Sequence, residues 1–177
     1  MTRRRFLRAV SAAFLTPWVG GLAAASRAEE SPSGSVPVDR LDLPKSTWKK
    51  LLPSDAYAVL FEEATERPFS SALNDEKRRG VFVCAACHLP LFSSDAKYDS
   101  GTGWPSFFRA LPGRVGTKRD FALLFPRTEY HCIRCGGHQG HLFDDGPAPT
   151  GLRYCNNGVA LRFVPEGEPS PALRTAP

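Results

Sequence analysis

Two Cys-x-x-Cys pairs constrain this chain more than any other feature of its sequence. The first pair is Cys84 and Cys87, and the second is Cys132 and Cys135. This spacing lets a tight turn present two sulfurs on one side, and two such turns supply the four thiolates of a tetrahedral zinc site. The sequence therefore predicts one structural zinc ion held by these four cysteines.

Other chemistry is open to the same cysteines. A disulfide within each turn would suit an oxidising compartment, and a redox-active Cys-x-x-Cys is a further alternative. Two matched pairs favour zinc, because a matched set is more specific than a single pair. His88 and His131 adjoin the pairs. Four sulfurs already complete the metal shell, so we expect neither histidine to be a ligand.

From about residue 80 onward the chain has the pattern of a β protein. Short apolar runs are separated by glycine and proline, as is typical of antiparallel strands. Examples are residues 80–83, 121–125 and 159–163. Residues 45–64 have a helical pattern that Pro53 divides in two. We therefore expect one mainly β domain over residues 45–165, with antiparallel strands and short N-terminal helices.

The segments on either side of this domain differ from it in composition. Residues 29–44 are rich in Ser, Pro and Asp, which indicates a flexible linker, and residues 166–177 are rich in proline. We expect this last segment to be a disordered tail.

The first 28 residues have the pattern of an export signal. Arginines crowd residues 2–8, a weakly apolar stretch follows, and Ser26-Arg27-Ala28 offers a cleavage site before Glu29. The arginine pair followed by Phe6-Leu7 resembles the twin-arginine motif. A Sec signal and an amphipathic anchor helix are the alternatives. We expect a periplasmic protein, exported folded and without a stable membrane association once the signal is removed.

The net charge of +5 comes from the first 28 residues, so it does not support nucleic-acid binding by the domain that follows. Residues 1–28 hold five arginines and no acid, and without them 18 basic residues face 18 acidic ones. A neutral domain lacks the basic surface that a nucleic-acid partner requires.

The fifth cysteine, Cys155, lies in the polar segment Arg153-Tyr154-Cys155-Asn156-Asn157. It is either a small buried side chain or a nucleophile. His138 and His141 could protonate a substrate beside it, or could bind a second metal with Asp144 or Asp145. Trp104, in a loop of glycine and proline, could wall an apolar pocket or cover a sheet edge.

Taken together, these segments resemble the methionine sulfoxide reductases of the B type, which reduce the R epimer of the sulfoxide. The resemblance covers residues 47–165 in order and spacing. Its segments are residues 65–69, 84–87, 90–92, 97–107, 132–135, 137–143, 145–147 and 153–155. It implies two antiparallel sheets, with the zinc site remote from the chemistry.

The resemblance also implies roles for particular residues. Cys155 matches the nucleophile, which becomes a sulfenic acid, and His138 and His141 match the histidines that hold or protonate the sulfoxide oxygen. Asn157 matches a polar residue that supports the site, and Trp104 matches the indole that packs on the substrate methyl group. The chain departs from the family's pattern at two further positions, Gln139 and Asn156, where an apolar residue is usual.

These roles predict an enzyme, a peptide-methionine (R)-S-oxide reductase that repairs oxidised proteins. Many relatives carry a resolving cysteine, but this chain has Thr102 in one usual position and Ser70 and Ser71 near another. We therefore expect a thioredoxin-like protein or a small thiol to reduce the sulfenic acid. The alternatives are a zinc-ribbon-like binding module without turnover, and a zinc hydrolase that uses the two histidines.

Overall fold

The computed structural model describes residues 38–121 and 126–177. The expected signal over residues 1–28 and most of the expected linker lie outside the described residues, as do residues 122–125. None of the described helices is long and apolar enough to span a lipid bilayer.

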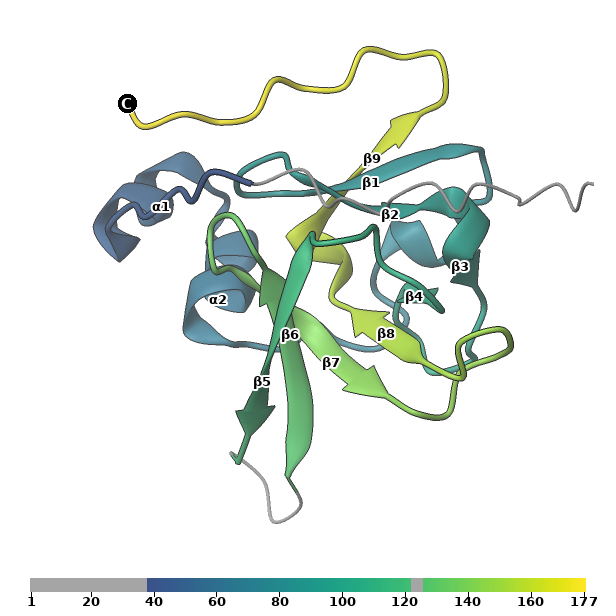
Figure 1. Ribbon diagram of the computed structural model, residues 1–177. Helices are drawn as coiled ribbons and strands as arrows, with labels where there is room; N and C mark the ends of the chain where they lie inside the picture. Colours follow the sequence, from purple (N-terminus) through teal and green to yellow (C-terminus); the bar gives the residue numbers. More distant parts are fainter. Residues whose placement is uncertain (1–37, 122–125) are drawn as a thin grey trace, which may run out of the picture. The chain divides into compact units, whose positions relative to one another are not determined.

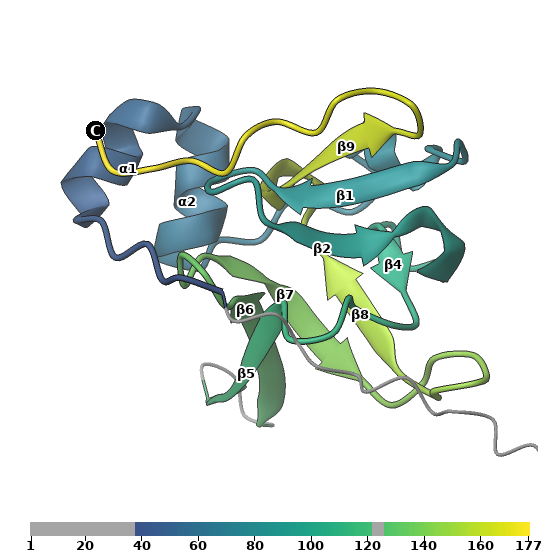
Figure 2. The same ribbon diagram turned by 45° about the horizontal axis from the view of Figure 1, so that its top comes forward.

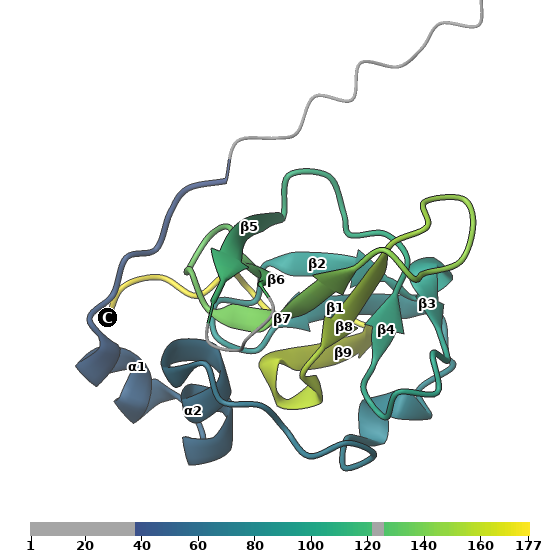
Figure 3. The same ribbon diagram turned by 90° about the horizontal axis from the view of Figure 1, so that it is seen from below.

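Two short helices begin the described chain. They are α1 (Lys45–Leu51) and α2 (Ser54–Glu62), and Pro53 separates them as predicted. Pro44 and Pro53 stand immediately before the helices, where a missing N–H costs nothing. The helices lie side by side at one end of the domain (Figure 3). They bury Trp48 and Leu60 against the rest of the core.

Two antiparallel sheets form the rest of the domain, which confirms the predicted fold class. The smaller sheet has the order β2 (Pro90–Ser93), β1 (Gly80–Cys84), β9 (Leu161–Pro165). The larger sheet has the order β3 (Lys97–Tyr98), β4 (Ser106–Phe107), β8 (Arg153–Asn156), β7 (His138–Phe143), β6 (Arg127–Cys132), β5 (Val115–Asp120). Among the described residues, the 3-10 helix η1 (Ala72–Asn74) lies between α2 and β1, η2 (Ser94–Ala96) lies between β2 and β3, and η3 (Gly158–Ala160) lies between β8 and β9. Figure 1 shows this arrangement.

The smaller sheet lies above the larger one in Figure 2. Aromatic side chains from both sheets pack against one another in the core. Phe82 and Phe92 come from the smaller sheet, and Phe107 and Tyr130 come from the larger one. The rings of Phe92 and Phe107 stack at 4.2 Å between centroids, and Phe82 meets Phe107 edge-on at 4.9 Å. All four side chains are fully buried, so this aromatic layer holds the two sheets together.

Of the three apolar runs that predicted strands, residues 80–83 fall on β1, and residues 159–163 run from the end of η3 into the first half of β9. Of the run at 121–125, only Phe121 is described; it follows the end of β5 at Asp120 and is 71% exposed, and residues 122–125 lie outside the described residues. The described strands on either side of this run are the polar segments 115–120 and 127–132. Many side chains of these two strands are charged or polar rather than apolar, so a search for apolar runs does not find them.

The segments expected to be a linker and a disordered tail contact the domain where they are described. Leu41 is buried, and its N–H donates to the carbonyl of Arg134. Residues 166–177 form no helix or strand, but the main-chain N–H of Arg174 donates to Cys87 O at 3.1 Å. The Arg174 Nε donates to Ala86 O at 2.6 Å. Proline-rich composition disfavours regular structure without preventing such contacts, so the last residues lie against the first Cys-x-x-Cys turn.

Candidate metal centre and active site

The four paired cysteines come together in one buried cluster. Their sulfurs all lie within 4.8 Å of one another, and all four residues are buried. Cys84 Sγ lies 3.7 Å from Cys135 Sγ, and Cys87 Sγ lies 3.5 Å from Cys132 Sγ. A tetrahedral zinc site with bonds of about 2.3 Å separates its sulfurs by about 3.8 Å. The cluster therefore fits a four-thiolate zinc ion, and the shortest contacts join the two turns rather than closing a disulfide within either.

Two matching turns present these sulfurs. Each returns a hydrogen bond to its first cysteine: His88 N donates to Cys84 O, and Gly136 N donates to Cys132 O, both at 2.9 Å. His88 and Gly136, each directly after the second cysteine of its turn, have φ of 63° and 72°. The first turn leaves the smaller sheet and the second leaves the larger one, so a metal ion here would join the two sheets.

The electrostatics of the cluster also suit a cation. Contacts with the neighbouring sulfurs, together with burial, raise the pKa of Cys84 well above its ordinary value. A divalent cation reverses that balance, because metal binding requires and stabilises the thiolates. His88 and His131 are not among the clustered residues. His88 Nδ1 instead donates to Ala172 O at 2.9 Å, consistent with the prediction that four sulfurs suffice.

Cys155 is not part of this cluster and lies on β8, an inner strand of the larger sheet. On β8 it pairs with Ser106 of β4 on one side and His141 of β7 on the other. Burial raises the pKa of the Cys155 thiol, while the positive charge of Arg153 and a hydrogen bond from Thr102 partly offset that rise. Arg153 reaches the thiol because residues two apart share a strand face. Its guanidinium is also held by both carboxylate oxygens of Asp145, at 2.7 and 2.8 Å.

A small pocket opens over Cys155. It encloses about 120 Å³, well below the roughly 300–1,000 Å³ of sites for drug-sized ligands. Its lining residues are Thr65, Trp104, Arg127, Gly140, His141, Phe143, Cys155, Asn156 and Asn157. The pocket therefore brings together four of the five predicted site residues and has room for about one side chain.

Trp104 forms a wall of this pocket rather than covering a sheet edge. Its indole Nε1 donates to Glu66 O at 3.0 Å, which fixes the ring. The loop before it turns through Gly101 and Gly103, whose φ values of 70° and 91° suit glycine alone. A Cβ at Gly103 would also meet the Phe69 ring at 2.9 Å. The loop sequence thus sets the direction of the indole.

The two predicted histidines occupy different depths. His141 lines the pocket, and its Nε2 donates to Asp120 Oδ2 at 2.8 Å, an oxygen that Arg127 also contacts at 2.7 Å. Burial lowers the pKa of His141, and Asp120 opposes that shift. His138 lies behind it with 3% of its surface exposed, and the two rings meet edge-on at 5.4 Å. His138 is therefore not a pocket-lining residue in this structure.

A β-bulge explains how residues three apart reach one side of the sheet. Tyr130 pairs with Gly140 but the next residue, His131, pairs with His138, so Gln139 is the extra residue. A bulge resets the alternation of side chains. His138 and His141 consequently face each other, while Gln139 points away toward the cluster of sulfurs.

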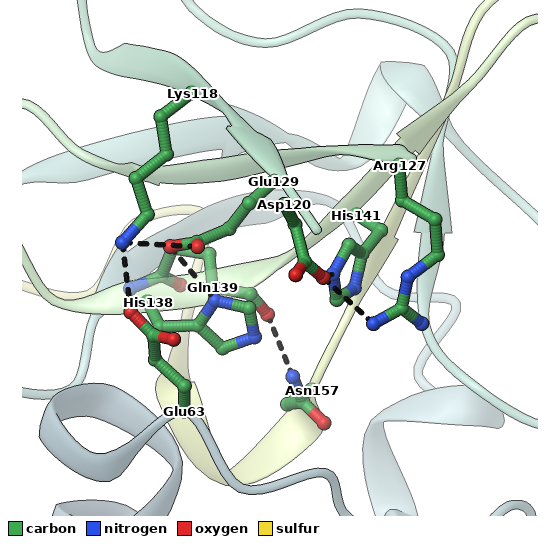
Figure 4. A network of polar contacts seen from close by, with 9 residues as sticks. All are labelled: Glu63, Lys118, Asp120, Arg127, Glu129, His138, Gln139, His141 and Asn157. Atoms are coloured by element: carbon green, nitrogen blue, oxygen red, sulfur yellow. Dashed lines mark hydrogen bonds and ion pairs between the residues drawn. The ribbon is translucent and has the colours of Figure 1, made fainter. Parts of the chain in front are cut away.

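Charged residues that the sequence analysis missed hold both histidines (Figure 4). Glu129, only 3% exposed, places Oε1 3.0 Å from His138 Nδ1 and Oε2 3.1 Å from Lys118 Nζ. The His138 contact is at ion-pair distance without the alignment of a straight hydrogen bond. Lys118 also binds Glu63 at 2.7 Å. Lys118 and Glu129 lie on the neighbouring strands β5 and β6, and Glu63 lies at the end of α2. The one signal in the sequence that could have identified them is the alternation of charged side chains along β5 and β6.

Asn157 joins three segments around the pocket. Its N–H and its side-chain Nδ2 both donate to Gln139 O, at 2.8 and 3.0 Å. Its Oδ1 accepts from Glu66 N at 2.9 Å. The amide is thus fully engaged in bonds that fix the strand ends around Cys155, which matches a supporting role.

Nothing in the described residues supports a second metal site. The four cysteines are the sole group of three or more metal-binding side chains found close together there. Asp145 binds Arg153 rather than a histidine. The partners of His138 and His141 are Glu129 and Asp120, so the grouping with Asp144 or Asp145 is not formed.

The fold and the two sites define a mainly β protein with four clustered cysteines that could hold a metal ion and one separate cysteine in a small pocket. The family model described as the SelR domain matches residues 52–165. A protein of Methanosarcina barkeri named peptide methionine sulfoxide reductase MsrB is 53% identical over 122 residues, or 68% of this chain and 86% of that protein. One of the same name from Bradyrhizobium diazoefficiens is 49% identical over 129 residues, or 72% of this chain and 93% of that protein. The chain belongs to the SelR domain family of MsrB peptide methionine sulfoxide reductases.

Proposed function

We propose that this chain reduces the R epimer of peptide-bound methionine sulfoxide through a sulfenic acid on Cys155. Family membership makes it a peptide methionine sulfoxide reductase of the B type. One observation carries the finer proposal: a lone half-buried thiol lines a small pocket together with Trp104 and His141. Such a pocket admits one apolar side chain with a polar sulfoxide.

The proposed step transfers one oxygen atom. The Cys155 sulfur attacks the sulfoxide sulfur, the substrate S–O bond breaks, and an S–O bond forms on Cys155. The sulfoxide is reduced by two electrons to methionine, and the cysteine is oxidised by two electrons to sulfenic acid. No net proton is consumed, because the proton that the thiol gives up equals the one carried by the sulfenic acid.

His141 is placed to carry that proton. It is the cross-strand partner of Cys155, and its Nε2 donates to Asp120, which leaves Nδ1 to accept or release a proton. His138 supports it from behind, with Glu129 on the far side. We propose that these two carboxylate–histidine pairs orient the acid that protonates the sulfoxide oxygen.

Cys84, Cys87, Cys132 and Cys135 would hold one zinc ion. The ion would supply cross-linking between the sheets rather than chemistry, because its four ligands leave no open coordination position. This division favours an enzyme over a zinc-ribbon-like binding module, since such a module needs no thiol pocket. A hydrolase using the two histidines lacks the metal-binding group that it would require among the described residues.

An external thiol would complete the cycle. Thr102, in one position where relatives carry a resolving cysteine, lies beside Cys155 and cannot form a disulfide. A first thiol would displace water from the sulfenic acid to give a mixed disulfide, and a second would release Cys155. We propose a thioredoxin-like protein or a small thiol as the reductant, and oxidised proteins as the substrates.

We also propose that the chain works in the periplasm after twin-arginine export. The support is the sequence of residues 1–28. Replacing Arg3, Arg4 and Arg5 by lysine should abolish export, as measured by cell fractionation. Unchanged export would refute the twin-arginine assignment.

The stereochemical test uses both epimers of a peptide methionine sulfoxide with dithiothreitol as reductant. The R epimer should be consumed and the S epimer left, as followed by chiral chromatography. Comparable turnover of the S epimer would contradict the proposed specificity.

A further inference from the structure

Gln139 occupies an unusual place between the two sites. It is the extra residue of the β-bulge in β7, directly between His138 and Gly140, and none of its surface is exposed. A long amide side chain at a fully buried position needs partners, because an unpaired polar group there is costly. Its partners therefore indicate why glutamine stands at this position.

The side chain of Gln139 reaches the sulfur cluster. Its Nε2 lies 3.5 Å from Cys84 Sγ and donates to it. Among the described side chains, it is the one that donates a nitrogen hydrogen bond to these sulfurs. Its Oε1 is buried without a partner in the described residues. The side-chain nitrogen of Gln139 is therefore hydrogen-bonded to the Cys84 sulfur, while its side-chain oxygen has no partner in the described residues.

This orientation follows from the chemistry of the acceptor. The two ends of an amide differ only in hydrogen bonding, and a thiolate can accept but not donate. The reverse orientation would point the amide oxygen at an anionic sulfur. Four thiolates around a divalent cation carry a net charge of −2, so a buried N–H donor on one of them is stabilising.

We propose that Gln139 protects the metal centre by drawing charge from the Cys84 thiolate. A sulfur that accepts a hydrogen bond is a weaker nucleophile toward oxidants, and the partners of metal ligands tune their reactivity. The reaction that it would slow is attack of the Cys84 thiolate on hydrogen peroxide. In that step an S–O bond forms, the O–O bond breaks and hydroxide leaves, and the oxidised sulfur no longer holds the metal.

Such protection would suit the proposed function, on which this role in part rests. An enzyme that works among oxidants needs Cys155 to react while the other four cysteines do not. The main-chain oxygen of Gln139 accepts both bonds from Asn157. One residue therefore contacts the metal centre with its side chain and the pocket with its backbone. Only the side chain is changed by substitution, so the two contacts can be separated.

The experiment measures zinc release from the zinc-loaded protein treated with hydrogen peroxide, using a chromogenic chelator. Gln139→Leu and Gln139→Met keep a similar volume and remove the N–H donor. We expect both to release zinc about tenfold faster than the unmodified chain, at the low end of the effects known for partners of metal ligands. Tyr130→Phe is the control, because it removes a buried hydrogen bond that the hydroxyl donates to Asn156 rather than to a sulfur of the cluster. It should release zinc at the unmodified rate.

A spectroscopic measurement separates charge withdrawal from loosened packing. In the cobalt-substituted protein, loss of the N–H donor should move the sulfur-to-metal charge-transfer band to lower energy. An unshifted band, or equal acceleration of zinc release in Tyr130→Phe, would overturn the proposal. Neither readout requires turnover, so an inactive enzyme would refute the proposed function without affecting this test.

Discussion

The metal centre and the Cys155 pocket both depend on cysteine, but they surround it differently. In the metal centre, four buried sulfurs lie within 4.8 Å of one another, in turns closed by backbone hydrogen bonds. In the pocket, one half-buried sulfur stands alone, with Arg153 and Thr102 as its polar neighbours. The clustered thiols are placed so that one shared cation could bind all four, whereas Cys155 is isolated and faces a pocket that a substrate could enter. The proposed roles of the five cysteines, structural for four and reactive for one, therefore follow from their neighbours.

The largest effect should follow from removing one ligand of the metal centre. Cys132→Ser deletes the sulfur 3.5 Å from Cys87 Sγ and leaves three ligands. Structural zinc sites contribute about 10–16 kcal/mol in isolated peptides, comparable with the entire stability of a domain. We expect loss of zinc by elemental analysis and loss of cooperative thermal unfolding by circular dichroism. A zinc-loaded variant that unfolds cooperatively would contradict this.

The same substitution at Cys155 should separate function from stability. Cys155→Ser replaces a half-buried thiol that is not in the metal cluster, so zinc content should stay at one ion per chain. Reduction of the R-sulfoxide should fall by several orders of magnitude, because the nucleophile is lost. Activity assays and elemental analysis on one preparation check both statements. Residual turnover near that of the unmodified chain would exclude Cys155 as the nucleophile.

A smaller loss of activity is expected when the carboxylate of Glu129, behind the pocket, is neutralised. Glu129→Gln keeps the shape of the side chain but removes the charge that faces His138 Nδ1. We expect kcat/KM to fall between about 10- and 100-fold, below the roughly 10²–10⁴-fold that a general acid contributes in full. Glu63→Gln is the matched control, because it neutralises the other carboxylate on Lys118 in an ion pair between two exposed side chains, and such pairs contribute about 0–1 kcal/mol. Equal losses in both variants would assign the effect to the charge balance around Lys118 rather than to the histidine.

The smallest effect concerns the charge beside Cys155. Because burial raises the pKa of this thiol, iodoacetamide should alkylate it slowly at neutral pH and faster as the pH rises through the ordinary thiol range. Arg153→Gln removes a positive charge that lowers this pKa, so the pKa should rise further. Alkylation at neutral pH should then slow several-fold, as measured by mass spectrometry. Faster alkylation of this variant would show that Arg153 does not stabilise the thiolate.

The sequence was most informative where a few adjacent residues determine the local backbone conformation and therefore the direction of their side chains. A Cys-x-x-Cys turn needs only its own backbone, so the four clustered sulfurs could be predicted from spacing. The loop that carries Trp104 could be predicted for the same reason, because Gly101 and Gly103 specify its turns. The position of Cys155 in a pocket came from resemblance rather than from local pattern.

The supporting residues could not be predicted, because they depend on pairing between distant strands. Glu129 meets His138 only after β6 and β7 align with a bulge at Gln139. Asp120 reaches His141 across two strand pairings. No local pattern marks such a register, and the same bulge places His138 behind the pocket rather than in it.

If the five cysteines have the proposed roles, Cys155 alone becomes oxidised during turnover and the four clustered cysteines keep their zinc. The direct measurement treats zinc-loaded protein with one equivalent of the R-sulfoxide, without reductant, and then adds dimedone. We expect one methionine formed per chain, one dimedone adduct on Cys155 by mass spectrometry, and unchanged zinc. A disulfide from Cys155 to Cys84, Cys87, Cys132 or Cys135, accompanied by zinc release, would contradict it.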